Sequence, residues 1–146
     1  ADRIAGRLHA QGIPAQLLHV EDLYPGWDGL AAGAAAVPQV LREGSYRKYN
    51  WATGEFGDPV LLLPDVPLII EGCGAVTADT LGAVQDRAGE SVWSVWIEAP
   101  TAQRRTRALA RDGGSYEPHW DRWAAQEDAF YATHTPWELV DEVLRS

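Results

Sequence analysis

The sequence predicts a single α/β domain over residues 1–146, in which a parallel sheet is flanked by helices. Short apolar runs without alternation at 16–20, 67–72 and 91–97 are typical of strands that are covered on both faces. Helical patterns separate these runs, and this order favours parallel strands joined by right-handed crossovers. The length suits one domain of roughly 100 to 150 residues, and no repeat or interdomain linker interrupts it.

The first half of the chain is expected to contain a helix, a strand, a second helix and a hairpin. Residues 1–11 have a helical pattern, which Gly12-Ile13-Pro14 ends because glycine suits a C-terminal cap and proline often follows it. After the first strand, a loop rich in glycine and proline leads into an alanine-rich helix at 30–41. Residues 46–56 alternate polar and aromatic side chains around Thr53-Gly54, which indicates a hairpin.

The second half continues the alternation of strand and helix. A helix is predicted at 77–88, with Thr77 or Asp79 as its cap, and Pro100 begins a long helix that carries arginines. The last helix covers 120–133. It has an apolar face that we expect in the core, made of Trp120, Trp123 and Phe130. The tail at 137–144 is compatible with a strand or a helix.

Composition excludes several classes of protein. The net charge of −9 argues against a DNA or RNA polymer as partner, because such binding requires cations that neutralise phosphates. A small phosphorylated ligand needs only a local basic patch. No apolar run approaches the roughly 20 residues of a membrane-spanning helix, and no signal peptide is recognisable. The lone Cys73 cannot form an internal disulfide, which favours the reducing cytoplasm. The oligomeric state stays open, and a homodimer is compatible with the sequence.

Carboxylates lie at the carboxyl ends of three of the predicted strands. Glu21-Asp22 comes after the first, Glu71 lies near the end of the second and Glu98 follows the third. Ligands of open α/β sheets bind beyond the carboxyl ends of the strands, so the sequence predicts a polar crevice at that edge. Glu98 alone also has a simpler explanation, because it precedes Ala99-Pro100 and would favour a helix start electrostatically.

Arginines form a row on the helix that begins at Pro100. Arg104, Arg107 and Arg111 are spaced to share one face, whereas Arg105 points elsewhere. Guanidinium groups suit phosphate oxygens, so the row is a candidate for phosphate binding, with Arg104 as a contact to a nucleotide cofactor. The row is equally compatible with a solvated face whose arginines pair with nearby acids.

Aromatic side chains gather in the loop and hairpin after the first strand, interleaved with charged residues. This pattern suits a planar base that is stacked and hydrogen-bonded at its edge, and it suits a half-buried hairpin about as well. The candidate substrate-binding residues are Tyr24, Trp27, Arg47, Tyr49 and Trp51. Metal and nucleophile sites have less support, because the four histidines show no ligand spacing and Cys73 follows a buried strand.

Several motifs together resemble a known family. They are the segment from Glu21-Asp22 to Gly29-Leu30, the stretch Ile70-Glu71-Gly72-Cys73-Gly74, the pair Arg107-x-x-x-Arg111-Asp112 and the stretch Pro118-His119-Trp120-Asp121-Arg122-Trp123-Ala124-Ala125-Gln126-Glu127. With them the chain resembles uridine kinase and related P-loop nucleoside kinases, and most closely an actinobacterial-type group of small ATP-binding proteins. The resemblance extends from Ala1 to about Phe130.

The resemblance implies a three-layer, P-loop kinase-like fold and ATP-dependent phosphoryl transfer to a nucleoside or a similar small hydroxyl-bearing metabolite, with ATP and Mg²⁺. Asp22 matches the acid that activates the acceptor hydroxyl. Glu71 matches the carboxylate that helps to hold Mg²⁺, usually through water. Arg107 and Arg111 match lid arginines that close on the transferring phosphate. Phosphoryl transfer depends on such positioning and charge neutralisation more than on covalent chemistry.

The sequence departs from the family in one respect. It contains no G-x-x-x-x-G-K-[ST] loop, which in the family follows a central strand and directly precedes a helix such as 1–11. Without that strand the sheet would be open in its middle. Position 1 is not methionine either, so we expect that a strand and P-loop upstream of Ala1 are missing from the sequence.

Two questions remain open at the level of sequence. If the loop is truly absent, the alternative is a non-catalytic nucleotide-binding or interaction domain. If it exists, the acceptor is a nucleoside, a nucleoside monophosphate or a sugar-like alcohol. A monophosphate would need additional basic contacts, for which Arg47 and Lys48 are the candidates.

Overall fold

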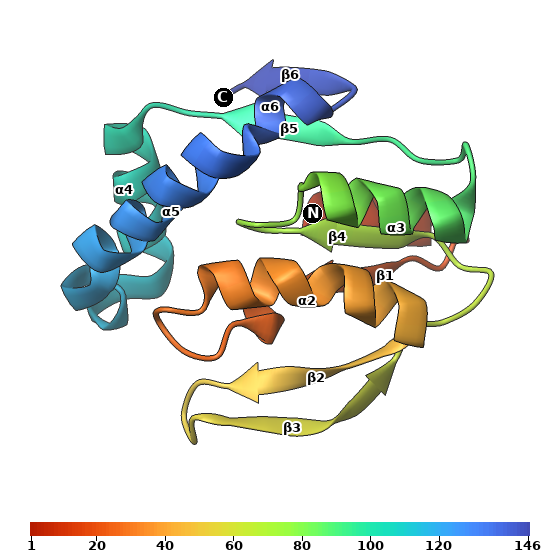
Figure 1. The fold of residues 1–146 in the computed structure, drawn as a ribbon, viewed down its shortest axis with the longest axis horizontal. Helices are drawn as coiled ribbons and strands as arrows, with labels where there is room; N and C mark the ends of the chain where they lie inside the picture. Colours follow the sequence, from red (N-terminus) through yellow and green to blue (C-terminus); the bar gives the residue numbers. More distant parts are fainter.

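The computed structural model describes residues 1–146 and shows a mixture of helices and strands (Figure 1). The α-helices are α1 Asp2–Ala10, α2 Leu30–Glu43, α3 Ala78–Ala88, α4 Thr101–Asp112, α5 Trp120–His134 and α6 Pro136–Leu139. The strands are β1 Gln16–His19, β2 Ser45–Asn50, β3 Glu55–Leu61, β4 Leu68–Glu71, β5 Val95–Glu98 and β6 Glu142–Arg145. Short 3₁₀ helices are η1 Val20–Leu23, η2 Gly113–Ser115 and η3 Glu117–His119.

Four of the strands form parallel pairs, in agreement with the predicted direction. β1 pairs with β4 in a register that runs from Gln16↔Leu68 to His19↔Glu71. β5 pairs with β6, from Val95↔Glu142 to Glu98↔Arg145. Figure 1 shows that these strands all run the same way, so their carboxyl ends face the same side of the molecule. β2 and β3 form the predicted hairpin as an antiparallel pair.

The parallel strands do not form the one sheet that the sequence predicts. They make two separate two-stranded sheets, because β4 is not hydrogen-bonded to β5 and no other strand of the chain lies between them. Each of these two strands therefore keeps one unpaired edge. Their apolar side chains are correspondingly less covered than expected: Ile97 is 64% exposed, and all four residues of β4 are only half-buried.

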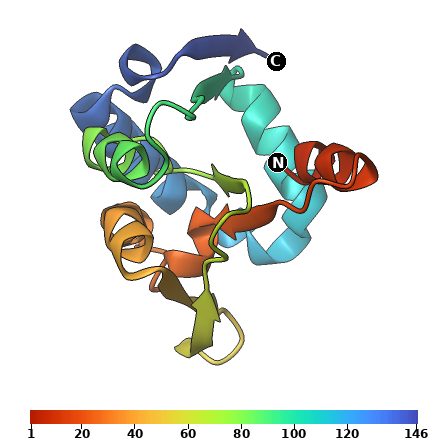
Figure 2. The ribbon, with the colours of Figure 1, turned by 90° about the vertical axis from the view of Figure 1, so that its right-hand side faces the viewer.

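The helices lie on both sides of the strands. Figure 2 shows α2 and α3 on one side of β1 and β4, and α1 and α4 on the other. The coverage is uneven, because α4 has no buried residue and α1 buries only Ala5, whereas α2 buries seven residues. None of the helices combines the length and the apolar composition that a membrane crossing requires.

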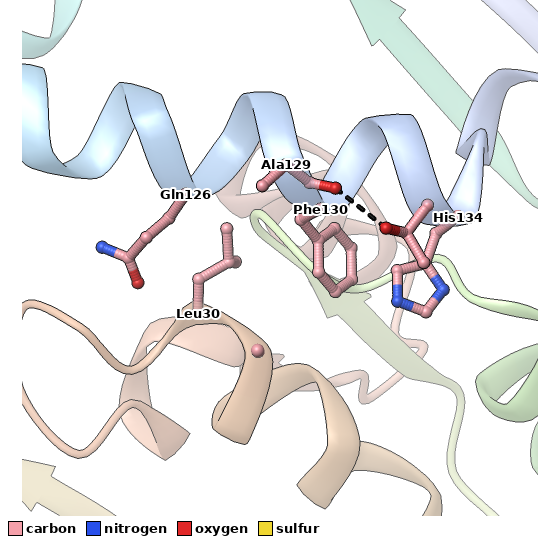
Figure 3. Close-up of a pocket in the computed structure, with 7 residues that line it drawn as sticks. Leu30, Gln126, Ala129, Phe130 and His134 are labelled. Atoms are coloured by element: carbon pink, nitrogen blue, oxygen red, sulfur yellow. Dashed lines mark hydrogen bonds between the residues drawn. The ribbon is translucent and has the colours of Figure 1, made fainter.

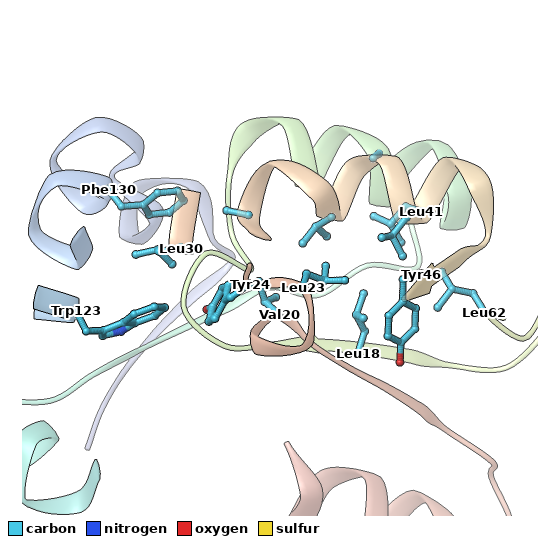
Figure 4. Packing of buried hydrophobic residues seen from close by; sticks show 14 residues of the cluster. Leu18, Val20, Leu23, Tyr24, Leu30, Leu41, Tyr46, Leu62, Trp123 and Phe130 are labelled. Atoms are coloured by element: carbon cyan, nitrogen blue, oxygen red, sulfur yellow. The ribbon is translucent and has the colours of Figure 1, made fainter. Parts of the chain in front are cut away.

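The hydrophobic core lies between β1, η1, α2 and α5 (Figure 4). Leu18, Val20 and Val37 are completely buried there. The apolar face of the last helix is confirmed as part of the buried interior, because Trp120, Trp123 and Phe130 are each at most 8% exposed. Burial of these side chains is the main stabilising contribution to the fold.

Some boundaries differ from the prediction for identifiable reasons. The third strand starts at Val95 instead of residue 91. Ser94 is bound to the C-terminal tail instead, because its backbone N–H and its hydroxyl both donate to Asp141 Oδ2 at 2.7 Å. The tail contains both alternatives, the short helix α6 and the strand β6. Thr77 is the cap of α3, since its Oγ1 accepts a hydrogen bond from the Thr80 N–H at 3.1 Å.

Truncation of the most enclosed strand residue should be costly. We expect Leu18→Ala to lower the free energy of unfolding by about 2 to 5 kcal/mol, because it removes buried methyl groups and leaves a cavity. Urea denaturation measures this change. Leu61→Ala is the matched control, since Leu61 is 68% exposed and its truncation should cost less than about 0.5 kcal/mol. Equal effects of the two substitutions would contradict the position of the core.

Candidate functional site

The carboxyl ends of β1 and β4 bring two polar side chains together. His19 and Glu71 face each other as the last pair of the register, and His19 Nδ1 contacts Glu71 Oε1. The second oxygen of Glu71, Oε2, makes no hydrogen bond with the protein, and the side chain is 39% exposed. Glu71 therefore ends its strand as an accessible carboxylate, as the sequence predicts.

Asp22 lies on η1, directly after β1. The 3₁₀ turn changes the direction of the chain and places the Asp22 side chain against the hairpin, where Lys48 Nζ of β2 lies 3.1 Å from Asp22 Oδ2. Asp22 is mostly buried, with 17% of its side chain exposed, whereas Lys48 is 54% exposed. The carboxylate raises the pKa of the Lys48 ammonium, because it stabilises the charged form.

The arginine row of α4 is divided among three partners. Arg104 Nη1 donates to Glu127 Oε2 on α5 at 2.7 Å. Arg107 Nη1 donates to Ser146 Oγ at 2.9 Å. Arg111 forms a bidentate contact with the adjacent Asp112, with distances of 2.9 and 2.7 Å to its two oxygens. The acid pairing that the sequence left open therefore exists for two of the three arginines.

The pKa of the Arg111 guanidinium is raised first by the adjacent Asp112 and to a lesser extent by Glu21, because both carboxylates favour its charged form. Glu98, by contrast, belongs to the other parallel pair and lies 3.6 Å from Arg145. The structure thus joins Glu21, Asp22 and Glu71 at one strand pair and leaves Glu98 on the second.

Of the predicted substrate-binding residues, Tyr24 lies in the core. It is 4% exposed, its ring lies 4.9 Å from that of Trp123, and its hydroxyl donates to the Cys73 carbonyl oxygen at 2.5 Å. Burial, together with nearby carboxylates, raises the pKa of this phenol far above its usual value. Tyr24 is therefore a packing residue of the core, and the aromatic residues that reach the surface are others.

These other aromatics form a connected cluster around Trp27. Its ring stacks on His119 at 4.2 Å with an interplanar angle of 11°, and it lies 5.0 Å from Trp51. Tyr49 meets Trp51 edge-on at 5.2 Å. Trp51 stays 43% exposed, so part of this aromatic surface faces solvent. Arg47, on the same hairpin, donates from Nη1 to the Gly57 carbonyl oxygen at 2.9 Å.

The loop after β1 and helix α5, which carry two of the motifs singled out in the sequence, contact each other. Arg122 of α5 pairs with Asp28, 94 positions away, and this contact lowers the pKa of the Asp28 carboxyl. Gln126 Nε2 donates to the Trp27 carbonyl oxygen at 2.7 Å. The loop after the first strand is therefore held on α5 by an ion pair, a hydrogen bond and the Trp27–His119 stack.

Glu127 is a polar residue that sequence reasoning missed. It is 7% exposed and accepts hydrogen bonds from Cys73 Sγ at 2.9 Å and Trp123 Nε1 at 3.1 Å, in addition to the one from Arg104. A signal for it does exist in the sequence. It shares a helical face with Trp123 and Phe130, and an acid on an apolar face indicates a buried, paired carboxylate.

The strand ends contain few ligands for a metal. No group of three or more histidine, cysteine and carboxylate side chains converges anywhere in the chain. Mg²⁺ nevertheless requires little from a protein, since it keeps several waters and is commonly bound through one or two carboxylates and substrate phosphates. The accessible Glu71, with Oε2 free of protein partners, fits that mode.

Two grooves have neither Asp22 nor Glu71 in their lining. One, of about 300 Å³, separates α2 from α5 and is lined largely by Leu30, Gln126, Ala129, Phe130 and His134 (Figure 3). The other, of about 470 Å³, lies between α2 and the hairpin and includes Arg47 and Phe56. The first is a shallow seam between packed helices, with few polar groups to orient a ligand.

The Cys73 thiol should react slowly. Burial and the adjacent Glu127 carboxylate raise its pKa to about 12, so it stays protonated at neutral and mildly alkaline pH. We expect alkylation by iodoacetamide at pH 8 to be on the order of 30-fold slower than in urea, because the thiolate is the nucleophile. Mass spectrometry measures both rates. Alkylation at the same rate in the folded and unfolded protein would contradict this environment for Cys73.

Comparison of the chain with protein-family models, curated proteins and solved structures finds no match. The interpretation of the site consequently depends on the chain's own residues. They include a shielded aspartate with a lysine partner and an accessible glutamate at the ends of two parallel strands, and a separate helix, α4, that carries arginines.

Proposed function

We propose that this chain belongs to an ATP-dependent small-molecule kinase of the nucleoside-kinase kind, which transfers the γ-phosphoryl group of ATP to a hydroxyl. One observation carries the proposal: Asp22 and Glu71 follow two strands that are hydrogen-bonded neighbours, so a proton acceptor and a metal-binding carboxylate belong to the same strand end. Phosphoryl transfer needs both functions side by side.

Asp22 is the proposed base. Its carboxylate accepts the proton of the acceptor hydroxyl while the hydroxyl oxygen forms a bond to the γ-phosphorus and the bond to the leaving ADP oxygen breaks. Lys48, 3.1 Å away, compensates the charge of the carboxylate. Glu71 would hold Mg²⁺, through water, and the ion would neutralise charge on the phosphates.

Arg107 and Arg111 are proposed to stabilise charge on the transferring phosphoryl oxygens. Both are exposed and bind groups near the surface, Ser146 and Asp112, which phosphate oxygens can replace. Arg104 is half-buried and engaged by Glu127, so the structure gives less support to a nucleotide contact from it.

The aromatic cluster is the proposed acceptor surface. Trp27, Tyr49 and Trp51 offer a partly exposed face for a planar base. The two cations that could bind an acceptor phosphate have other partners, because Lys48 pairs with Asp22 and Arg47 with a backbone carbonyl. This engagement favours an uncharged acceptor, a nucleoside, over a nucleoside monophosphate.

The proposal includes a phosphate-binding loop that residues 1–146 do not contain. The unpaired edges of β4 and β5 support a strand between them, which would complete a three-layer fold with one parallel sheet. A loop at the carboxyl end of such a strand would cradle the ATP phosphates near Glu71. Intact-mass measurement and N-terminal sequencing of the protein from its source test whether this segment exists.

We expect the complete protein to phosphorylate nucleosides at least tenfold more efficiently than nucleoside monophosphates. A monophosphate would add negative charge beside Asp22 and Glu71 without a free cation to compensate it. Radiolabelled ATP with a panel of both acceptor classes measures kcat/KM. A preference for monophosphates would contradict the assigned acceptor class, and ATP binding without any transfer would favour a non-catalytic nucleotide-binding domain.

Asp22→Asn should reduce kcat on the order of 100-fold or more and largely spare ATP binding, because it removes the proton acceptor and keeps the side-chain shape. Steady-state kinetics and calorimetric titration of ATP measure the two quantities. Glu21→Gln is the control, since it removes the same charge at the adjacent, exposed position. Near-normal turnover of the Asp22→Asn protein would exclude Asp22 as the base.

A further inference from the structure

Glu127 is the only charged side chain among the buried residues. A buried carboxylate is costly unless hydrogen bonds and an opposite charge compensate it. Here the compensation is complete on both oxygens. Oε1 accepts from Cys73 Sγ and Trp123 Nε1, and Oε2 accepts from Arg104 Nη1.

The three donors come from different parts of the candidate site. Cys73 belongs to the turn that follows Glu71, and its carbonyl oxygen accepts the hydroxyl hydrogen bond of Tyr24. The ring of Trp123 lies 4.9 Å from the ring of Tyr24. Tyr24 is two residues after Asp22 in the chain. Arg104 belongs to α4. One carboxylate thus contacts, directly or through one side chain, the segments that carry Asp22, Glu71 and the arginines of α4.

Helix α4 depends on this contact more than the other elements do. It has no buried residue, and few of its side chains hydrogen-bond to other parts of the chain. Arg104 donates to Glu127, Arg107 donates to Ser146 Oγ, and the Gln103 amide donates to the Ser146 carbonyl oxygen at 3.1 Å. Ser146 is exposed, so its hydroxyl provides a weak anchor. The Arg104–Glu127 pair, with side chains 35% and 9% exposed, is the better-shielded attachment.

We propose that Glu127 is a positioning residue that docks α4 on the body of the domain through Arg104. The docked helix holds Arg107 and Arg111 beside the strand ends, and its catalytic consequence rests on the proposed kinase function. Docking itself is a property of the fold and does not depend on that function. Glu127 acts through Arg104 and touches neither acceptor nor nucleotide.

Hydrogen–deuterium exchange of the purified protein tests the docking. In Glu127→Gln the side chain keeps its shape and loses the charge that Arg104 requires. We expect the amides of α4 to exchange on the order of tenfold faster or more, because the helix loses its shielded ion pair. The amides of β1, β4 and α2 should keep their protection, since their contacts are unchanged.

Two further variants make the result specific. Asp128→Asn removes the neighbouring, exposed charge of the same helix and should leave the exchange of α4 unchanged. Arg104→Gln removes the partner of Glu127 and should accelerate amide exchange in α4 as much as Glu127→Gln does. In the double variant these amides should exchange little faster than in either single variant. Unchanged exchange of α4 in Glu127→Gln, or equal acceleration throughout the domain, would overturn the proposal.

The catalytic consequence has a separate readout. In the complete protein we expect Glu127→Gln to lower kcat on the order of tenfold and to leave the KM for the acceptor unchanged, because the arginines act on the transferring phosphoryl group. An unchanged kcat together with faster exchange of α4 would overturn the positioning role and keep the docking. A wild-type protein without kinase activity would contradict the proposed function alone, since the exchange experiment does not need it.

Discussion

Parallel hydrogen bonding between β1 and β4 is the constraint on which the candidate site depends. His19 and Glu71 are 52 positions apart in the chain, and the register makes them neighbours at the strand ends. Where β1 ends, η1 turns the chain and directs Asp22 toward Lys48 of the hairpin. A slip of one residue in the β1–β4 register would move every side chain of the strand to the opposite face.

Close packing against α2 keeps the β1–β4 strand pair in place. α2 covers β1 and η1, and two glycines permit the approach. A Cβ at Gly33 would lie 2.4 Å from the Tyr24 ring, so the ring packs directly on the helix backbone. Gly74 has a φ of +85°, and a Cβ there would lie 2.8 Å from Ala34. The turn after Glu71 is thereby held against α2, and the hydrogen bond from Tyr24 to Cys73 joins it to the loop after β1.

Charge compensation over long distances in sequence is the second organising feature. The chain has a net charge of −9, yet three carboxylates in and near the site have cationic partners from remote elements. Lys48 approaches Asp22, Arg122 approaches Asp28, and Arg104 approaches Glu127. Only the Arg104–Glu127 pair has an almost fully buried carboxylate, so we expect it to differ in kind from the exposed pairs, whose individual contributions to stability are small. The acidic composition therefore coexists with a site in which cations are placed locally.

Short-range patterns in the sequence were sufficient to predict the local elements. Turn residues, caps and periodicity act over a few positions, so the helices, the hairpin, the Thr77 cap and the apolar face of α5 could be predicted. The sequence also located Asp22 and Glu71 at strand ends. The tertiary structure alone decided that the parallel strands form two separate pairs, that Tyr24 is buried and that the arginines of α4 diverge to different partners. Strand neighbours, ion pairs and burial depend on which distant segments meet, and no short-range pattern specifies that. Glu127 combines the two levels, since its helical face can be read from spacing but its donors belong to segments that only folding brings together.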